Sequence, residues 1–200
     1  CASGGGRNDL ESLRRGVPIL RSDNDRTSTA LRLSITTSFN KWIPFCGAIT
    51  REKEEQLSLL GKSDVYVWRA SYLPSLNIDA RFVHEPDMDY DLLRFGINEW
   101  KKVKPYLLKE FYTLTPWHSE DEKDSFTAYT YFDPETECGV LFVFRQEECE
   151  TDKIEIELPF DTSAMLTDVD TQKQFIAENG IFTACLDKKR TAKLYFYKLK

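Results

Sequence analysis

The second half of the chain is a succession of short, β-rich runs, and this pattern limits the fold more than any other feature of the sequence. Residues that favour strands, namely β-branched and aromatic ones, fill these runs, and charged or glycine-containing turns separate them. In residues 153–158 and 194–197, successive side chains alternate in character, as expected of strands. The pattern predicts an antiparallel β-sandwich of about 90 residues. The six runs are FTAYTYFD, GVLFVFRQ, KIEIELPF, AMLTDVDT, IFTACL and AKLYFYKL.

The first half instead alternates helix-like and strand-like segments. Asp25 or Thr27 is placed to cap the first of the longer helices. A change from mixed α and β segments to strands alone indicates two domains. We therefore expect an α/β domain over residues 1–109 and an all-β domain over residues 110–200. The segments expected in the first half are helices over 27–40, 51–61 and 87–105, strands over 17–23 and 65–72, and a buried strand or loop over 41–49.

Charge and hydropathy exclude two classes of partner. The chain has 27 lysines and arginines against 33 aspartates and glutamates, a net charge of −6. This charge repels nucleic acid and anionic membrane surfaces, so neither is an expected partner. The one compact basic run, residues 188–190, lies between two β-rich runs and is expected to be a solvated turn. No apolar stretch approaches the roughly 18 residues that a membrane-spanning helix needs.

The cysteines and histidines do not form a metal-binding pattern. The five cysteines are an odd, widely spaced set without a C-x-x-C pair, and His84 and His118 are the only histidines. A zinc site is therefore not expected. Reduced thiols suit a cytoplasmic protein, with export as the alternative. A nucleophilic Cys1 would need an oriented histidine. We therefore prefer a role for Cys1 as a small residue that lines a pocket.

Two stretches contain part of a phosphate-binding motif. GGGRND near the start lacks the G-x-G-x-x-G spacing, and no lysine follows at the right place. Gly61-Lys62-Ser63 has the tail of a P-loop, but Gln56 stands where that loop requires glycine. The sequence therefore does not favour nucleotide binding.

Acidic and arginine residues are interleaved over residues 7–26, which is typical of a surface ion-pair network. The context favours a second interpretation. A glycine-rich turn and a helix-like stretch lead into the apolar strand VPIL, and Arg21-Ser22-Asp23 follows directly. In a (β/α)₈ barrel, an acid at the carboxyl end of a strand lies on the catalytic face.

The run CASGGGRND at the start, followed by RSD at 21–23, resembles the C-x-S-G-G-G-R-x-D…S-D signature of the melibiase-type α-galactosidases of glycoside hydrolase family 36. The spacing from the cysteine to the last aspartate also matches. The resemblance implies that Asp23 is the general acid/base and that Cys1 and Gly4 line the galactose pocket. It implies a fold made of the C-terminal part of a (β/α)₈ TIM barrel followed by an antiparallel β-sandwich.

Several features depart from the family pattern. Glu11 stands where many members have glycine, and Arg21 replaces an aromatic residue, which indicates a divergent subgroup. Arg21 shares a strand face with Asp23, so it is expected either to contact a sugar hydroxyl or to pair with Asp9. Trp42 is a candidate for stacking on a sugar, with burial in the core as the alternative. The family's nucleophilic aspartate lies on an earlier strand, upstream of Cys1.

The resemblance implies a retaining glycoside hydrolase that removes terminal α-linked galactose from oligosaccharides. No metal or organic cofactor is expected, and oligomerisation would come through the full-length protein. Because the first barrel strands and the nucleophile are missing, we expect the fragment alone to be inactive and poorly stable. The alternatives are a non-catalytic carbohydrate-binding or partner-docking module, and a glycosidase of the same fold with another α-glycoside substrate.

Overall fold

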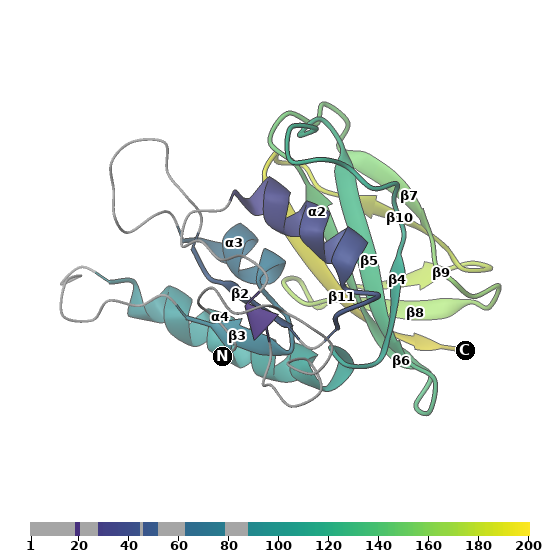
Figure 1. The fold of residues 1–200 in the computed structure, drawn as a ribbon. Helices are drawn as coiled ribbons and strands as arrows, with labels where there is room; N and C mark the ends of the chain where they lie inside the picture. The colour runs from purple at the N-terminus through teal and green to yellow at the C-terminus, as the bar shows by residue number, and fades with distance from the viewer. Residues whose placement is uncertain (1–18, 21–27, 45, 52–62, 79–87) are drawn as a thin grey trace. The chain divides into compact units, whose positions relative to one another are not determined.

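The computed structural model describes residues 19–20, 28–44, 46–51, 63–78 and 88–200 (Figure 1). The chain divides into two compact units, Cys1–Leu107 and Leu108–Lys200. The division falls two residues before the boundary expected from the sequence. We call the two parts unit 1 and unit 2 and describe each by itself.

Unit 1 contains a three-stranded parallel sheet in the order β1-β2-β3. One helix connects β1 to β2 and a second connects β2 to β3, so strands and helices alternate as expected of an α/β unit. A longer helix and a short 3₁₀ turn follow β3. The elements are β1 (Ile19–Leu20), α2 (Thr29–Phe39), β2 (Cys46–Ile49), α3 (Val65–Ala70), β3 (Ser75–Asn77), α4 (Tyr90–Val103) and η1 (Lys104–Tyr106).

The helix starts in unit 1 are fixed by side-chain caps. Ser28 caps α2 by accepting a hydrogen bond from the Leu31 backbone N–H at 3.0 Å. The expectation that Asp25 or Thr27 is the cap is therefore wrong, because α2 begins after both. Asp89 caps α4, which begins three residues later than the sequence predicted, and Pro105 lies in the 3₁₀ turn that follows the helix.

The strand predicted over residues 65–72 is also wrong, because Val65–Ala70 forms helix α3. Asp64 caps it by accepting from the Val67 backbone N–H at 3.0 Å. Every residue from 66 to 70 is buried. Apart from Arg69, the helix consists of apolar and aromatic residues, and a short run of this composition is typical of a buried strand as well as of a buried helix.

Helices α3 and α4 pack closely where Gly96 faces Trp68. The Trp68 indole is buried and donates to the Ser63 hydroxyl at 3.1 Å, which fixes its ring. A Cβ built on Gly96 would lie 2.1 Å from Cε3 of that ring. The glycine therefore allows α4 to approach α3 at this point.

Replacing Gly96 by Ala is expected to lower the free energy of unfolding of unit 1 by about 1–3 kcal/mol, because the added methyl group overpacks the contact with Trp68. Urea unfolding of the 200-residue chain, followed by tryptophan fluorescence, measures this change. Asn98→Ala on an exposed position of the same helix is the matched control, and it is expected to cost nothing. Equal stability of Gly96→Ala and Asn98→Ala would contradict the packing described here.

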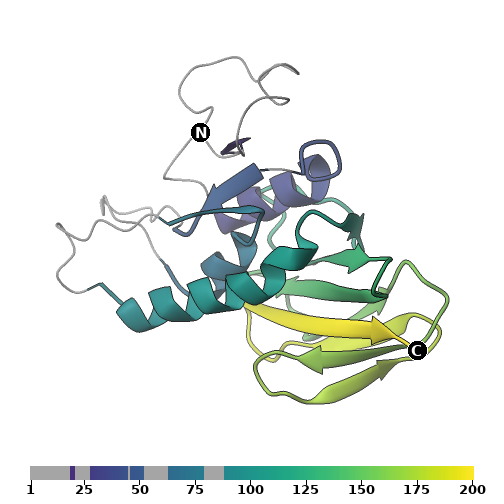
Figure 2. The ribbon, with the colours of Figure 1, turned by 90° about the horizontal axis from the view of Figure 1, so that it is seen from below.

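Unit 2 is built from two antiparallel sheets (Figure 2). The larger sheet has the order β4-β5-β6-β11-β8-β9, and the smaller pairs β10 with β7. All six predicted β-rich runs lie in strands, and the structure adds β4 and β9. The strands are β4 (Glu110–Thr113), β5 (Phe126–Asp133), β6 (Cys138–Arg145), β7 (Lys153–Glu157), β8 (Ala164–Asp168), β9 (Gln174–Ala177), β10 (Ile181–Cys185) and β11 (Thr191–Leu199).

The core of unit 2 is formed by the facing sides of the two sheets. The alternation predicted for β7 is confirmed, since Ile156 is fully buried and Glu155 and Glu157 are exposed. In β11, Leu194 and Tyr195 are both buried although they point to opposite sides. The strand lies between β6 and β8, so both of its backbone edges are paired.

A buried arginine joins two loops of unit 2. The guanidinium of Arg145, 5% exposed, donates to backbone carbonyl oxygens of unit 2. Its Nε and Nη2 donate to the Cys149 carbonyl at 3.1 and 2.9 Å, and Nη2 also donates to Glu150 at 3.1 Å. Its Nη1 donates to the carbonyls of Leu186 and Asp187 at 2.8 and 3.0 Å. One side chain thus holds the β6–β7 loop against the β10–β11 loop.

The basic run at 188–190 lies in this β10–β11 loop, and its prediction as a turn is confirmed. Lys189 forms an ion pair with Glu150, and Arg190 forms one with Glu147 at 3.2 Å. Acidic side chains of the same unit therefore neutralise part of the run.

A buried aspartate closes the turn after β8. Asp168 is fully buried and accepts from the backbone N–H groups of Asp170 and Thr171 at 2.8 and 3.0 Å. Lys193 donates to its other oxygen at 3.0 Å. Burial alone would raise the pKa of Asp168, but the Thr171 N–H, Lys193 and the Asp170 N–H together hold this pKa below the ordinary value of 3.8.

The lowered pKa predicts that acid destabilises unit 2. Because the unfolded chain binds the proton more readily, the stabilisation from ionised Asp168 is complete above about pH 5 and is lost as the pH falls below 3.8. Asp168→Asn is expected to cost about 1–3 kcal/mol at pH 7 and less at pH 3. Urea unfolding at the two pH values tests this, with exposed Asp161→Asn as control. An Asp168→Asn cost that is the same at both pH values would refute the assignment.

Candidate functional site

The candidate site lies at the carboxyl edge of the parallel strands of unit 1. Since β1, β2 and β3 are parallel, their carboxyl ends meet at one edge of the sheet. Asp23 follows the last residue of β1, Leu20, by three positions in the sequence. Asp23 itself lies outside the described residues, as do the other site residues from the opening motif, Cys1, Gly4 and Arg21.

Hydrogen bonds fix the backbone at this edge. The Thr50 N–H, directly after β2, donates to the Asn77 carbonyl at the end of β3 at 3.1 Å. The Ser63 hydroxyl donates to the Thr50 carbonyl at 2.9 Å. Thr50 is 1% exposed. The ends of β2 and β3 are therefore joined directly by a backbone hydrogen bond, and Ser63 adds a bond to the same residue of the β2 end.

Arg32 on α2 supports the same edge from within unit 1. Its guanidinium is buried, donates through Nη1 to the Ser71 hydroxyl at 3.1 Å, and donates through Nη2 to the Arg51 carbonyl. Ser71 in turn lies 2.7 Å from the carbonyl oxygen of Ile49, the last residue of β2. These contacts join α2 and the end of α3 to the end of β2. Arg32 is thus a positioning residue for the edge.

Glu99 on α4 is a second buried charged residue of unit 1, and its contacts join two helices. Arg69 of α3 binds it through two bonds, Nε to Oε2 at 3.0 Å and Nη2 to Oε1 at 2.8 Å. The Tyr72 hydroxyl donates to Oε2 at 2.9 Å. Both carboxylate oxygens are therefore occupied, and all three side chains are at most 4% exposed. Bidentate geometry of this kind fixes one element on another, so Glu99 joins α4 to α3 and does not serve as a catalytic carboxylate.

The sequence analysis did not predict the two buried arginines of unit 1, Arg32 and Arg69, or Glu99. Arg32 stands among apolar residues of a predicted helix, which was the one available signal. Glu99 and Arg69 lie 30 residues apart, so nothing local marked them as partners.

Trp42 is placed away from the carboxyl edge. It lies between α2 and β2, in a connection that leads to the amino end of β2. The indole is 83% exposed, so it is not a core residue either. In a parallel sheet the amino and carboxyl ends of a strand lie at opposite edges, and the structure therefore does not bring Trp42 to the candidate site.

No group of three or more histidine, cysteine or acidic side chains that suits a metal is present in the described part of the chain. Across the same ranges, the longest helices fall short of the length and apolar character needed to cross a membrane.

Comparisons with known proteins give a fold and no closer assignment. No protein-family model matches the chain, and no curated protein matches it. Among solved structures, an α-galactosidase from Lactobacillus brevis aligns over 88% of this chain with a TM-score of 0.66 and 11% identity. The family 36 α-galactosidase AgaA from Geobacillus stearothermophilus aligns over 88% with a TM-score of 0.62 and 13% identity. The galactosidase domain of the α-galactosidase-sucrose kinase AgaSK aligns over 88% of this chain with a TM-score of 0.64 and 12% identity.

The alignments cover only 25–26% of those three proteins, so the chain spans about a quarter of the length of the structures it matches. At these identities the likeness is one of fold. The antiparallel sheets of unit 2 match the C-terminal β domain of family 36 enzymes. The chain therefore has a glycosidase-related fold.

Proposed function

We propose that the chain is the C-terminal part of a retaining α-galactosidase-like glycoside hydrolase, in which unit 1 completes a (β/α)₈ barrel and unit 2 is the β domain that follows it in the sequence. One observation carries the proposal. The acid of the RSD motif follows a strand of a parallel sheet, within a fold that aligns with α-galactosidases over 88% of the chain. The substrate class is an oligosaccharide with terminal α-linked galactose.

In this proposal Asp23 is the general acid/base. Retaining glycosidases use two carboxyl groups about 5–5.5 Å apart. The nucleophile, supplied by barrel strands outside these 200 residues, attacks the anomeric carbon while Asp23 protonates the departing glycosidic oxygen. The carboxylate of Asp23 then takes a proton from water, which attacks the same carbon and frees the nucleophile. The configuration at the anomeric carbon is thus retained.

The remaining motif residues shape the pocket. Cys1 and Gly4 are small enough to let the sugar approach the backbone, and Arg21 offers hydrogen bonds to a hydroxyl. Both chemical roles are filled by carboxyl groups, so the mechanism uses no metal or organic cofactor. Trp42 is left out of the site because it lies at the amino end of β2.

Assays on nitrophenyl α-galactoside test the proposal. The full-length protein that contains these residues is expected to turn over this substrate, and the 200-residue chain alone is not, because it lacks the nucleophile. A panel with α-glucoside and α-N-acetylgalactosaminide reports the sugar preference. Sugar binding without hydrolysis by the full-length protein would identify a binding module instead. Turnover by the isolated chain would contradict the assignment of the nucleophile to upstream residues.

A further inference from the structure

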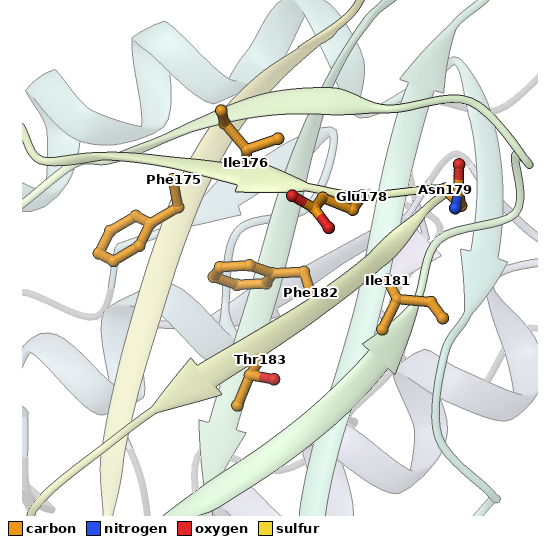
Figure 3. A pocket seen from close by; sticks show the side chains of 7 residues that line it. All are labelled: Phe175, Ile176, Glu178, Asn179, Ile181, Phe182 and Thr183. Carbon is orange, nitrogen blue, oxygen red and sulfur yellow. The ribbon is translucent and has the colours of Figure 1, made fainter.

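A groove of about 500 Å³ lies between β9 and β10 of unit 2 (Figure 3). It is far in the sequence from the residues of the proposed active site. Its lining combines aromatic and aliphatic side chains with one carboxylate, one amide and one hydroxyl. These side chains are Phe175 and Ile176 from β9, Glu178 and Asn179 from the turn, and Ile181, Phe182 and Thr183 from β10.

The groove forms because β9 and β10, the two strands of a hairpin, separate after the first residue pair next to the turn. Asn179 and Gly180 have φ angles of 50° and 80°, as in the two-residue turn that suits a β-hairpin. Glu178 and Ile181 exchange backbone hydrogen bonds of 3.1 and 2.9 Å. Beyond this pair, β9 pairs with β8 in the larger sheet and β10 pairs with β7 in the smaller one. Each strand is therefore left with one edge toward the groove.

The hydrogen-bond pattern identifies the backbone groups on the edge of β10. Leu158 donates to the Gly180 carbonyl and Leu186 donates to the Asp152 carbonyl, both at 2.8 Å. In an antiparallel pair these bonds recur at every second residue, so Phe182 also bonds to β7. The N–H and carbonyl of Thr183 therefore point to the other side, where no strand pairs with β10 within residues 88–200.

Exposed apolar side chains gather beside this free edge. Ile176 is 54% exposed, Ile181 47%, and Phe175 37%. The Phe175 ring also contacts the buried rings of Phe182 and Tyr195, at centroid distances of 5.9 and 6.2 Å. An apolar side chain placed in the groove would thus extend an aromatic cluster that the core already contains. Such a patch is typical of an interaction surface.

The charge around the groove is negative at the hairpin end. Glu178 lies in the lining, and Glu157 and Glu155 of β7 stand opposite Ile181 and Thr183. All three carboxylates are exposed, and none forms an ion pair with another described residue. Lys153 stands at the far end of the same strand pair. A partner with lysine or arginine toward the hairpin end is therefore complementary.

We propose that this edge binds an extended peptide segment of a partner protein as an added β-strand. The segment bonds to the free backbone groups of β10, places an apolar side chain against Phe175 and Phe182, and places basic side chains near Glu178. This function goes beyond the proposed hydrolase activity and does not depend on it.

The probe is a fluorescein-labelled, N-acetylated octapeptide of alternating lysine and valine, and its binding to the 200-residue chain is followed by anisotropy. Thr183→Pro removes the N–H on the free edge and leaves the bonds from β10 to β7, whereas Thr183→Ala keeps that N–H. We expect Thr183→Pro to weaken binding about tenfold or more and Thr183→Ala to change it less than about threefold. Circular dichroism verifies that both variants fold.

Two further measurements do not depend on the folding of Thr183→Pro. N-methylation of alternate residues of the peptide is expected to abolish binding, because it removes the donors of an added strand. Glu178→Lys is expected to weaken binding of the lysine peptide and to strengthen binding of the matching glutamate and valine peptide. Failure of the wild-type chain to bind the lysine peptide, or binding unaffected by N-methylation, overturns the proposal. Dimerisation of the chain through this edge without peptide binding overturns it too, in favour of a second copy as occupant.

Discussion

The full-length protein with Asp23 replaced by Asn is expected to hydrolyse a disaccharide with terminal α-galactose about 10²–10⁴ times more slowly than the wild type. The amide has nearly the shape of the carboxylic acid, but it has no proton to give to the departing oxygen. The loss should be smaller for an aryl galactoside with an activated leaving group, because that group departs without protonation. Comparison of kcat/KM for the two substrates measures the effect.

Trp42→Ala is the matched control for this experiment. The indole is exposed and lies at the amino end of β2, so its removal is expected to change kcat/KM by less than about threefold. A loss as large as that of Asp23→Asn would mean that the substrate lies at the amino edge of the sheet. An Asp23→Asn enzyme of wild-type activity on both substrates would remove Asp23 from the mechanism.

Replacing Arg145 by Ala is expected to lower the free energy of unfolding of unit 2 by about 3–5 kcal/mol. All five N–H groups of this guanidinium donate, and the four acceptors are backbone carbonyls of two loops. Without the side chain these carbonyls lose a charged donor, and the loops lose their connection. Arg145→Lys should recover only part of the loss, because an ammonium group has three donors and no planar fork. Urea unfolding of the 200-residue chain measures both variants.

Lys189→Ala in the neighbouring turn provides the comparison. Its ion pair with Glu150 is formed between exposed side chains, which typically contribute less than about 1 kcal/mol. If Arg145→Ala and Lys189→Ala lowered the free energy of unfolding by similar amounts, the buried contacts of Arg145 with the carbonyls would stabilise unit 2 no more than an exposed ion pair does. That result would contradict the prediction.

The fold of unit 2 was accessible from the sequence to a greater extent than that of unit 1. Strand residues and turns alternate so regularly after residue 125 that all six runs were placed. The strands missed, β4 and β9, have four residues each and no alternation of buried and exposed positions. In unit 1, a helix buried on all sides was mistaken for a strand, because composition does not distinguish the two. Asp64, which caps that helix, is the sequence feature that favours a helix at this position.

The candidate site likewise combines residues that lie close together in the sequence with contacts between residues that lie far apart. The proposed role of Asp23 rests on a motif of nearby residues that resembles the family 36 signature, and it stays a prediction. The supporting contacts of Arg32 with Ser71, and of Arg69 with Glu99, join residues 30 or more positions apart, and no local pattern announces them. The edge of β10 likewise became free only because its hairpin partner joins a different sheet, which depends on the topology of the whole unit.

The role of Asp23 as general acid/base is tested most directly by the reaction of full-length Asp23→Ala with an activated aryl α-galactoside in the presence of azide. The nucleophile can still displace the activated group, but the galactosyl-enzyme then lacks a base to activate water. Azide needs no such base. We expect azide to restore turnover and the product to be α-galactosyl azide, with the configuration of the substrate. Hydrolysis at the wild-type rate without azide, or no acceleration by azide, would contradict this role of Asp23.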